Sequence, residues 1–305
     1  MSTPDDLRVS TPDDLRPRRS VLYMPGANER ALEKAASLPA DCLILDLEDA
    51  VAPDAKPDAR AAVCAAVAEG RYGPREVAIR VNGLDTAWFA DDVAAAAEAG
   101  PDVVLVPKVS SVADVTAIET ALQRAGAPDT TTIWAMLETP QAILRAEAVT
   151  AASERLTGFV MGTNDLAKEL GATHVPGRAP LLTSLSWCVL AAKAAGKVVL
   201  DAVFNDLDDA DGFEQECRQG RAFGFDGKTL IHPKQLEPCN RIFAPSTDEV
   251  ADARAVIEAF EAAQHKGGTG AQGVVTVNGR MIEQLHVDQA RQVLAVTAAI
   301  EARAD

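Results

Sequence analysis

The stretch 132–140, Thr-Ile-Trp-Ala-Met-Leu-Glu-Thr-Pro, joins an apolar run to a helix start and places one carboxylate, Glu138, at the junction. The apolar run has the length and composition of a buried strand. The Thr-Pro pair is typical of a helix start, because proline is favoured in the first helical turn. The stretch 156–166 repeats this arrangement and places Asp165 just after its own apolar run. Both stretches predict a strand end that presents a carboxylate.

Short apolar runs alternate with alanine-rich segments along the chain from Ser20 onward. The runs, which are strand candidates, are 21–24, 43–47, 77–81, 103–106, 133–137, 159–161, 198–203 and 227–231. The helix candidates between them are 27–37, 58–68, 87–99, 112–125, 140–151, 181–195 and 211–222. This alternation predicts parallel strands with right-handed crossovers, and about eight strands suit a (β/α)₈ (TIM) barrel. A doubly wound open sheet is the alternative fold.

A barrel places its reactive residues at the carboxyl ends of the strands, and polar residues follow five successive runs of this chain. These residues are Glu48 with Asp49, Arg80 with Asn82, Lys108, Glu138 and Asp165. Two carboxylates completed by waters and substrate oxygens suit Mg²⁺, and Mn²⁺ accepts the same ligands. We therefore predict a divalent-metal site at Glu138 and Asp165.

Each residue also has a structural interpretation. Asp46 and Arg80 form a buried ion pair in that interpretation, and Lys108 packs its stem along a rim. Glu138 belongs to a helix start and Asp165 caps a helix. These alternatives compete well one at a time, but polar residues on five successive strands favour a functional site.

Composition excludes several classes of protein. The 305 residues have a net charge of −16, which would repel nucleic acid, so we expect no nucleic-acid partner. No apolar stretch approaches about 18 residues, so we expect no membrane span. Five cysteines without CxxC spacing argue against a disulfide framework and a zinc cluster, and favour a cytoplasmic location. The GxSxG, Walker A, GxGxxG and HExxH motifs are absent.

The chain divides into four segments by composition. Residues 1–17 repeat Ser-Thr-Pro-Asp-Asp-Leu-Arg and are predicted to be a disordered tail. Residues 18–263 are the predicted barrel, the glycine-rich 264–273 is a linker, and 274–305 is a carboxyl-terminal segment that ends in an amphipathic helix.

Eight motifs together resemble the citrate lyase beta-subunit-like family of CoA-ester lyases, within the HpcH/HpaI aldolase superfamily. The resemblance runs in order through nearly all of residues 18–300. The motifs are Ser-Val-Leu-Tyr-Met-Pro-Gly at 20–26, Leu-Asp-Leu-Glu-Asp-Ala-Val at 45–51, Arg-Val-Asn-Gly at 80–83, Val-Pro-Lys-Val at 106–109, Met-Leu-Glu-Thr-Pro at 136–140, Gly-Thr-Asn-Asp at 162–165, Gly-Phe-Asp-Gly-Lys at 224–228 and Ile-His-Pro at 231–233.

The resemblance implies a Mg²⁺-dependent TIM barrel, usually a homotrimer, that acts on a CoA thioester and a small 2-oxo acid. By motif, Glu138 and Asp165 would ligate the metal. Arg80 would bind the substrate oxygens, while Asp46 and Glu48 would hold Arg80 and metal-bound water. The residues that would lie along CoA are Arg18, Arg19, Ser20, Ile231, His232 and Pro233, and Lys108 is a further basic candidate.

In the resembled family the carboxyl-terminal segment caps the active site of a neighbouring subunit, and its Met-Ile-Asp string supplies a proton-shuttling aspartate. This chain reads Met-Ile-Glu, ending at Glu283. A displacement of about one ångström from the added methylene can lower a rate about a hundredfold. We expect a lyase that splits or forms a short dicarboxylic 3-hydroxyacyl-CoA of the malyl-CoA, citramalyl-CoA or methylmalyl-CoA type. The alternatives are a malyl-CoA thioesterase and a citrate lyase beta subunit within a complex. We also expect Arg80→Ala to leave folding intact and lower turnover at least roughly a hundredfold.

Overall fold

The computed structural model describes residues 16–266, 275–277 and 280–303. Contacts between residues divide the chain into two units, and each is described by itself. The first is Arg18–Phe243, and the second groups Ala244–Asp305 with the amino-terminal residues. The structure therefore moves the end of the predicted barrel domain from residue 263 to residue 243.

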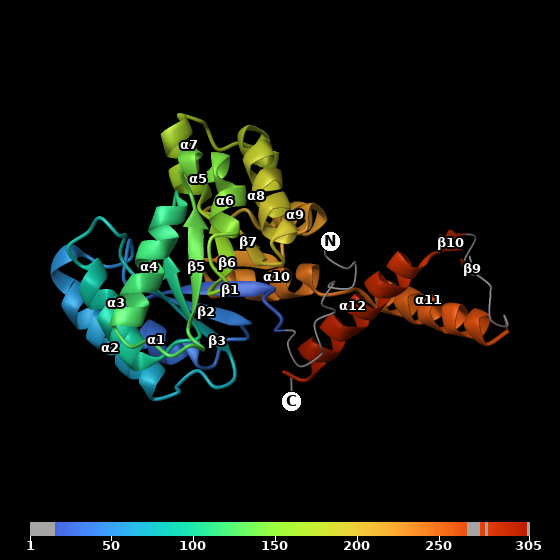
Figure 1. The fold of residues 1–305 in the computed structure, drawn as a ribbon, viewed down its shortest axis with the longest axis horizontal. Coiled ribbons are helices and arrows are strands. Elements are labelled where there is room, and N and C mark those ends of the chain that lie inside the picture. Colours follow the sequence, from blue (N-terminus) through green and yellow to red (C-terminus); the bar gives the residue numbers. More distant parts are fainter. Residues whose placement is uncertain (1–15, 267–274, 278–279, 304–305) are drawn as a thin grey trace, which may run out of the picture. The chain divides into compact units, whose positions relative to one another are not determined.

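The first unit is a closed barrel of eight parallel strands with helices around its outside (Figure 1). The strands follow one another in sequence order: β1 (Ser20–Pro25), β2 (Cys42–Asp46), β3 (Glu76–Arg80), β4 (Val103–Val106), β5 (Thr132–Leu137), β6 (Leu156–Met161), β7 (Val198–Asp201) and β8 (Gly227–Leu230). The predicted TIM barrel is confirmed, and the open sheet is excluded because β1 pairs with β8.

Helices follow the strands, and the seven predicted segments are helical, whereas the helices at Thr163–Leu170 and Leu236–Phe243 were not predicted. They are α1 (Glu29–Ala35), α2 (Lys56–Ala68), α3 (Phe89–Ala99), α4 (Val112–Arg124), α5 (Pro140–Leu144), α6 (Ala146–Thr150), α7 (Thr163–Leu170), α8 (Leu182–Ala194), α9 (Ala210–Phe223) and α10 (Leu236–Phe243). The helix predicted at 140–151 is two short helices, because Arg145 leaves the helical conformation.

Side-chain alternation explains how the barrel aims its polar residues. Strand residues point to opposite faces with a period of two. Cys42 and Ile44 of β2 belong to the core inside the barrel, whereas Leu43 and Leu45 pack in the core that contains the surrounding helices. The next inward position of β2 is Asp46, at the carboxyl end. The same alternation brings functional residues into the mouth of the barrel from several strands.

The second unit contains two helices and a short antiparallel ribbon. These are α11 (Thr247–Lys266), β9 (Val275–Val277), β10 (Arg280–Ile282) and α12 (Gln284–Glu301). Residues of both helices and β10 form its small core: Ala253, Val256, Ile282, Val287 and Ala290. Of the predicted linker 264–273, residues 264–266 end α11, and the rest lies outside the described residues, as do residues 1–15 of the predicted tail. None of the described helices has the length and apolarity needed to cross a membrane.

Candidate active site

A buried ion pair joins the carboxyl ends of β2 and β3 at the mouth of the barrel. Asp46 and Arg80 are neighbours in the strand register and both face inward. Arg80 Nε donates to Asp46 Oδ1 at 2.6 Å, and Nη2 donates to Oδ2 at 2.7 Å. Bidentate guanidinium–carboxylate pairs fix orientation as well as charge. Asp46 therefore holds the guanidinium plane in one position.

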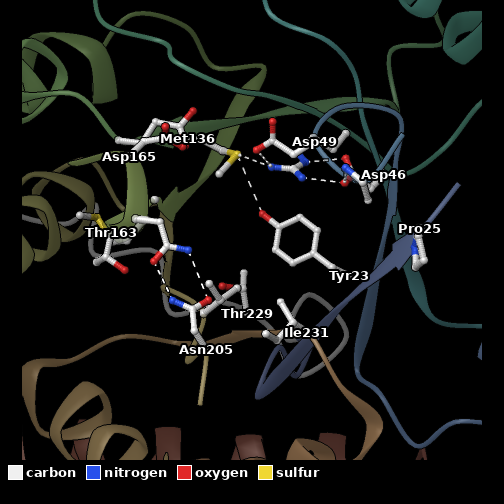
Figure 2. Close-up of a pocket in the computed structure, with 17 residues that line it drawn as sticks. Tyr23, Pro25, Asp46, Asp49, Met136, Thr163, Asp165, Asn205, Thr229 and Ile231 are labelled. Atoms are coloured by element: carbon white, nitrogen blue, oxygen red, sulfur yellow. Dashed lines mark hydrogen bonds and ion pairs between the residues drawn. The ribbon is translucent and has the colours of Figure 1, made fainter. Parts of the chain in front are cut away.

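Further contacts of Arg80 come from Tyr23, Met136 and the loop after β2, and Figure 2 shows Tyr23, Met136, Asp46 and Asp49 around the same pocket. Nη1 lies 2.9 Å from Glu48 Oε2 and donates to Met136 Sδ at 3.8 Å. The Tyr23 ring lies 4.8 Å from the guanidinium carbon, so one face of the cation stacks on an aromatic surface. These contacts extend the ion pair that the sequence predicts between Asp46 and Arg80.

Electrostatics keep this cluster charged at Arg80 and neutral at Tyr23. Burial would lower the pKa of Arg80, but Asp46 outweighs it and holds the pKa well above the ordinary value. Burial raises the pKa of Tyr23 despite the nearby Arg80. Burial also raises the pKa of Glu48, against the opposing charge of Arg80. Glu48 is therefore a more basic carboxylate than an exposed glutamate.

Glu138 and Asp165 line the same cavity of about 460 Å³ as Asp46 and Arg80. Glu138, at the end of β5, is almost fully buried. Burial and then the negative charge of Asp165 raise the pKa of Glu138 to about 7, while the backbone N–H of Lys108 acts in the opposite direction. The charges of the two carboxylates therefore influence each other within one cavity, and metal binding by this pair stays a prediction.

Local packing positions both carboxylates. Asp165 lies in the first turn of α7, but Gly162 is the N-cap, so Asp165 is not the helix cap of the structural alternative. Gly162 allows close approach, because a Cβ there would overlap Cβ and Oε2 of Glu138. Glu138 Oε1 in turn accepts a hydrogen bond of 2.7 Å from the Lys108 backbone N–H.

The pair fits a hard divalent cation. Within the described residues no group of three or more His, Cys, Asp or Glu side chains has metal-binding geometry. Mg²⁺ commonly uses one or two protein carboxylates and keeps several waters or substrate oxygens. A cation would also relieve the repulsion that raises the pKa of Glu138. Glu138 and Asp165 are thus suited to Mg²⁺ or Mn²⁺ rather than to a closed zinc site.

Lys108 contributes through its backbone. It has a φ of 56°, which is uncommon for a residue with a side chain, and this conformation accompanies the hydrogen bond to Glu138. Burial would lower the pKa of Lys108, but Asp165 and Glu48 outweigh it and raise the pKa. The side chain is exposed, and its contact with an anionic cofactor remains a prediction.

The structure corrects the placement of Arg18, Arg19 and Ser20 along CoA. They lie at the amino end of β1, whereas the cavity lies at the carboxyl ends of the strands. Arg18 pairs with Glu76, the first residue of β3, and Arg19 pairs with Asp41 at 2.8 Å. Ser20 is fully buried. The sequence did not reveal that these two arginines form ion pairs with acidic residues near the amino ends of β2 and β3, at the opposite end of the barrel from the cavity.

The other predicted CoA residues lie just after β8. Ile231 lines the cavity. His232 is the N-cap of a short 3₁₀ turn, Pro233–Gln235, and its Nδ1 accepts from the Lys234 backbone at 3.1 Å. His232 and Pro233 therefore shape the loop behind Ile231, and their contact with CoA remains a prediction.

Glu283 belongs to the second unit. It is exposed and is the N-cap residue of α12, and its backbone N–H donates to His286 Nδ1 at 3.0 Å. Its role in proton transfer and the capping of a neighbouring subunit remain predictions.

Sequence reasoning missed several residues of the cavity wall: Tyr23, Met136, Val203, Asn205 and Thr229. The alternation that turns Asp46 inward also identifies Tyr23 and Met136, since each lies two residues from another inward or cavity-lining position of its strand. Asn205 follows β7 in an irregular loop, so no periodicity marks it.

Known proteins resemble this chain in sequence and in fold. The "(3S)-malyl-CoA thioesterase" of Cereibacter sphaeroides is 51% identical over 286 residues, covering 94% of this chain and 96% of the relative. Citrate lyase subunit beta of Escherichia coli K12 is 38% identical over 285 residues, 92% of this chain and 93% of the relative. The crystal structure of CitE from Mycobacterium tuberculosis with magnesium, acetoacetate and coenzyme A has a TM-score of 0.72 at 30% identity, covering 92% of this chain and 97% of that one. Residues 19–233 match the model of the HpcH/HpaI aldolase/citrate lyase family. The chain belongs to the HpcH/HpaI aldolase/citrate lyase family.

Proposed function

We propose that the chain is a Mg²⁺-dependent enzyme that hydrolyses the thioester of a short dicarboxylic 3-hydroxyacyl-CoA of the malyl-CoA type. The observation that carries the proposal is one cavity lined by Glu138, Asp165 and Arg80. Hydrolysis ranks above C–C cleavage because thioesterase relatives are 51% identical, against 38% for a citrate lyase subunit. The change of the family's aspartate to Glu283 also favours a chemistry that does not need that proton shuttle.

Glu138 and Asp165 would hold the metal ion. When bound, Mg²⁺ would supply a Lewis acid that polarises substrate oxygens and a template that orients the acid end. Arg80 and the side chains around it would stabilise charge and transfer the proton.

Arg80 would stabilise the negative charge that develops on the thioester oxygen. Asp46 and the Tyr23 ring hold its guanidinium in place before substrate binds, so little reorganisation is needed. Such preorganised donors are worth about 3 kcal/mol each by mutagenesis.

Glu48 would be the base. Its raised pKa favours proton acceptance, and its buried Oε2 makes no hydrogen bond, although it lies 2.9 Å from Arg80 Nη1. A water would give a proton to Glu48 while its oxygen attacks the thioester carbon. The C–S bond would then break, and CoA would leave as the thiol after taking that proton.

C–C cleavage is the second candidate, supported by the citrate lyase relatives. In that reaction the 3-hydroxyl would lose its proton to a base, and a 2-oxo acid would depart. Charge would move onto the thioester oxygen, where Arg80 would again stabilise it. The same cavity thus serves both reactions, and only the products separate them.

The test is a product-resolved assay with (3S)-malyl-CoA and Mg²⁺. We expect malate and free CoA, and loss of both in Glu138→Gln or after chelation. Glyoxylate and acetyl-CoA would instead establish the lyase. If neither product pair forms although the metal binds, both candidates are overturned.

A further inference from the structure

The hydroxyl group of Tyr23 lies in the catalytic cavity, and the mechanism proposed above does not use it. Tyr23 occupies an inward position of β1, because Val21, two residues earlier, belongs to the core inside the barrel and the Tyr23 side chain packs against the same core. Tyr23 lines the cavity together with Arg80 and Glu138. Its hydroxyl points away from β1 toward Met136 Sδ, which lies 3.9 Å away (Figure 2).

Arg80 and Tyr23 donate to the same sulfur atom. Arg80 Nη1 lies 3.8 Å from Met136 Sδ, whereas Nε and Nη2 donate to Asp46. A thioether sulfur is a weak acceptor, so both donors can turn to a stronger acceptor at little cost. An N–H group from β3 and an O–H group from β1 therefore meet at one point of the cavity wall, beside Met136.

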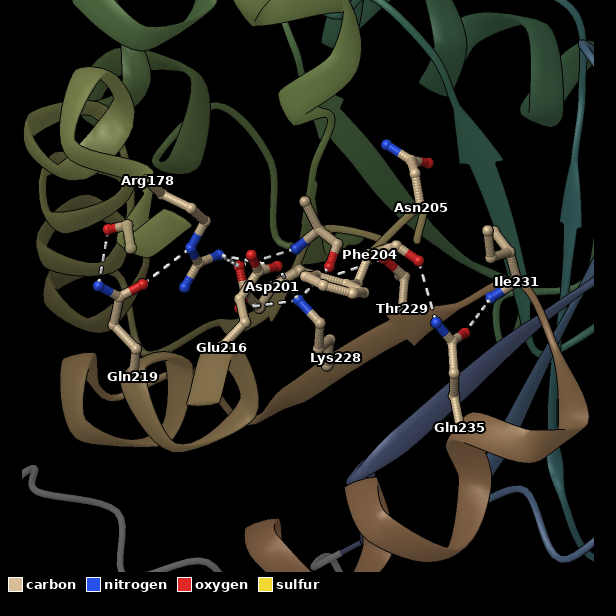
Figure 3. Close-up of polar contacts among 12 residues, drawn as sticks. Arg178, Asp201, Phe204, Asn205, Glu216, Gln219, Lys228, Thr229, Ile231 and Gln235 are labelled. Atoms are coloured by element: carbon tan, nitrogen blue, oxygen red, sulfur yellow. Dashed lines mark hydrogen bonds and ion pairs between the residues drawn. The ribbon is translucent and has the colours of Figure 1, made fainter. Parts of the chain in front are cut away.

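Both groups remain donors at neutral pH. Burial raises the pKa of Tyr23, so its hydroxyl keeps the proton. Asp46 holds the pKa of Arg80 well above the ordinary value, so the guanidinium keeps its charge. The Thr229 hydroxyl lines the same cavity, but it already donates to the Asp201 carbonyl at 2.9 Å (Figure 3). Tyr23 is therefore the better placed of these two hydroxyl donors.

Thioester hydrolysis needs donors of this kind. When the water attacks, the carbonyl double bond becomes a single bond and the thioester oxygen takes a full negative charge. Oxyanion sites commonly combine two preorganised donors that are aimed at this oxygen. Because Asp46 engages Nε and Nη2 of Arg80, Nη1 is the nitrogen that turns toward Met136, and the Tyr23 hydroxyl adds a second donor at that point.

We propose that Tyr23 is a catalytic residue, whose hydroxyl forms an oxyanion site together with Arg80 Nη1 and donates a hydrogen bond to the thioester oxygen. The inference rests on the proposed function, because that oxygen belongs to its substrate. Tyr23 keeps its own proton throughout, while the proton of the attacking water passes to Glu48 and then to the departing sulfur. The Tyr23 ring has a separate role, since it holds the guanidinium of Arg80 at 4.8 Å.

Tyr23→Phe tests the proposal, because it retains the ring and removes only the hydroxyl. In steady-state kinetics with (3S)-malyl-CoA and Mg²⁺, kcat should fall about a hundredfold, as for the loss of one oxyanion donor. KM should change by less than about threefold, because the donor acts mainly on the charge of the transition state. The Tm should stay near that of the wild type, since the described acceptor of this hydroxyl is a weakly accepting sulfur.

Tyr72→Phe is the matched control. The Tyr72 hydroxyl is buried and has no hydrogen-bond partner among the described residues, and Tyr72 does not line the cavity. This variant should therefore retain the kcat and KM of the wild type. An equal fall of kcat in Tyr72→Phe would show that the loss does not depend on a donor in the cavity, and would overturn the proposal.

The remaining outcomes separate this inference from the proposed function. A wild-type kcat in Tyr23→Phe, with hydrolysis still lost in Glu138→Gln, would exclude the Tyr23 hydroxyl and leave the proposed function standing. A higher KM at constant kcat would show that the hydroxyl binds the substrate without stabilising the oxyanion. If the wild type forms no product from malyl-CoA, the proposed function fails together with this inference.

Discussion

Arg80 is a buried cation whose partners are also buried. Asp46 is 2% exposed and Arg80 is 8% exposed. Removing one partner of a buried ion pair commonly destabilises a protein by about 3–5 kcal/mol, because the other charge stays in the interior. With this geometry we expect Arg80→Ala to destabilise the fold as well as to lower turnover, so a charge-conserving variant is the better probe.

Arg80→Lys should lower kcat/KM at least about a hundredfold, because an ammonium cannot make the two parallel bonds to Asp46 or present a planar donor set. Steady-state kinetics measures the loss, and thermal unfolding checks the fold. Arg60→Lys is the matched control, since Arg60 also pairs with a buried aspartate, Asp92, at 2.7 Å, but does not line the cavity. Wild-type kcat/KM in Arg80→Lys would remove Arg80 from the mechanism.

The pKa of Glu138 predicts how metal binding depends on pH. Glu138 must be deprotonated to ligate, and its pKa in the metal-free protein is about 7. Mg²⁺ affinity should therefore be greatest above pH 7 and should fall about tenfold for each pH unit below pH 7. The metal-free fold should gain stability as pH falls through 7, because the folded state then binds the additional proton.

Calorimetric titration of Mg²⁺ between pH 5.5 and 8 measures this dependence. Glu169→Gln, which removes an exposed acid later in α7, should retain the wild-type profile, whereas Glu138→Gln should lose most of the affinity. An affinity that stays constant from pH 6 to pH 8 contradicts the assignment of Glu138 as a ligand.

At the scale of elements, a buried charge network joins β7, β8 and α9. Asp201 and Lys228 are strand neighbours, and both are fully buried. Burial would raise the pKa of Asp201, but Lys228 and then Arg178 outweigh it and hold the pKa below the ordinary value. The network stabilises this side of the barrel only while all its members are present.

Lys228→Met should destabilise the protein by about 3–5 kcal/mol, because it leaves Asp201 and Glu216 short of a buried partner. Chemical denaturation measures the change. Lys193→Met removes a half-exposed partner of Asp226, at 2.5 Å, and should change the free energy of unfolding by less than about 1 kcal/mol. Equal effects of the two variants would contradict the buried network.

The close contact between the β6 loop and the end of β5 makes a separate prediction. Gly162→Ala should weaken Mg²⁺ binding at least about tenfold, because the new Cβ would displace the Glu138 carboxylate. Gly70→Ala controls for general strain: Gly70 has a φ of +65° and no atom near its Cβ position, so it should lose stability while retaining Mg²⁺ affinity. Unchanged affinity in Gly162→Ala would show that Mg²⁺ binding by Glu138 does not depend on the close contact with Gly162.

At the scale of the whole molecule, the chain consists of a barrel unit and a separate carboxyl-terminal unit that carries Glu283. If Glu283 occupies the place of the family's proton-shuttling aspartate, Glu283→Asp should raise C–C cleavage relative to hydrolysis by up to about a hundredfold. The measurement is the ratio of glyoxylate to malate formed from malyl-CoA. Glu301→Asp, in the same unit at the end of α12, should leave that ratio unchanged, and an unchanged ratio in Glu283→Asp would show that this position does not control the reaction.

Much of the barrel was predictable because its signals are local. Apolar runs of strand length and the helices between them gave all eight strands, although β7 ends at Asp201 rather than at 203. The α11 helix was not predicted, since the sequence up to 263 was assigned to the barrel. The direction of Asp46 and Arg80 follows from alternation, whereas the partners of Arg18 and Arg19 do not, because ion pairs depend on which strand starts become neighbours.

The sequence by itself determined which residues of each strand face inward and which polar residues follow the strand ends, because both depend on a period of two and on local helix-start chemistry. Only the tertiary structure decided that Glu138 and Asp165 line one cavity, that Tyr23 and Met136 contact Arg80, and that Asn205 lines two adjoining cavities. These facts depend on closing the ring of strands, which brings together residues far apart in the chain whose proximity has no local signal.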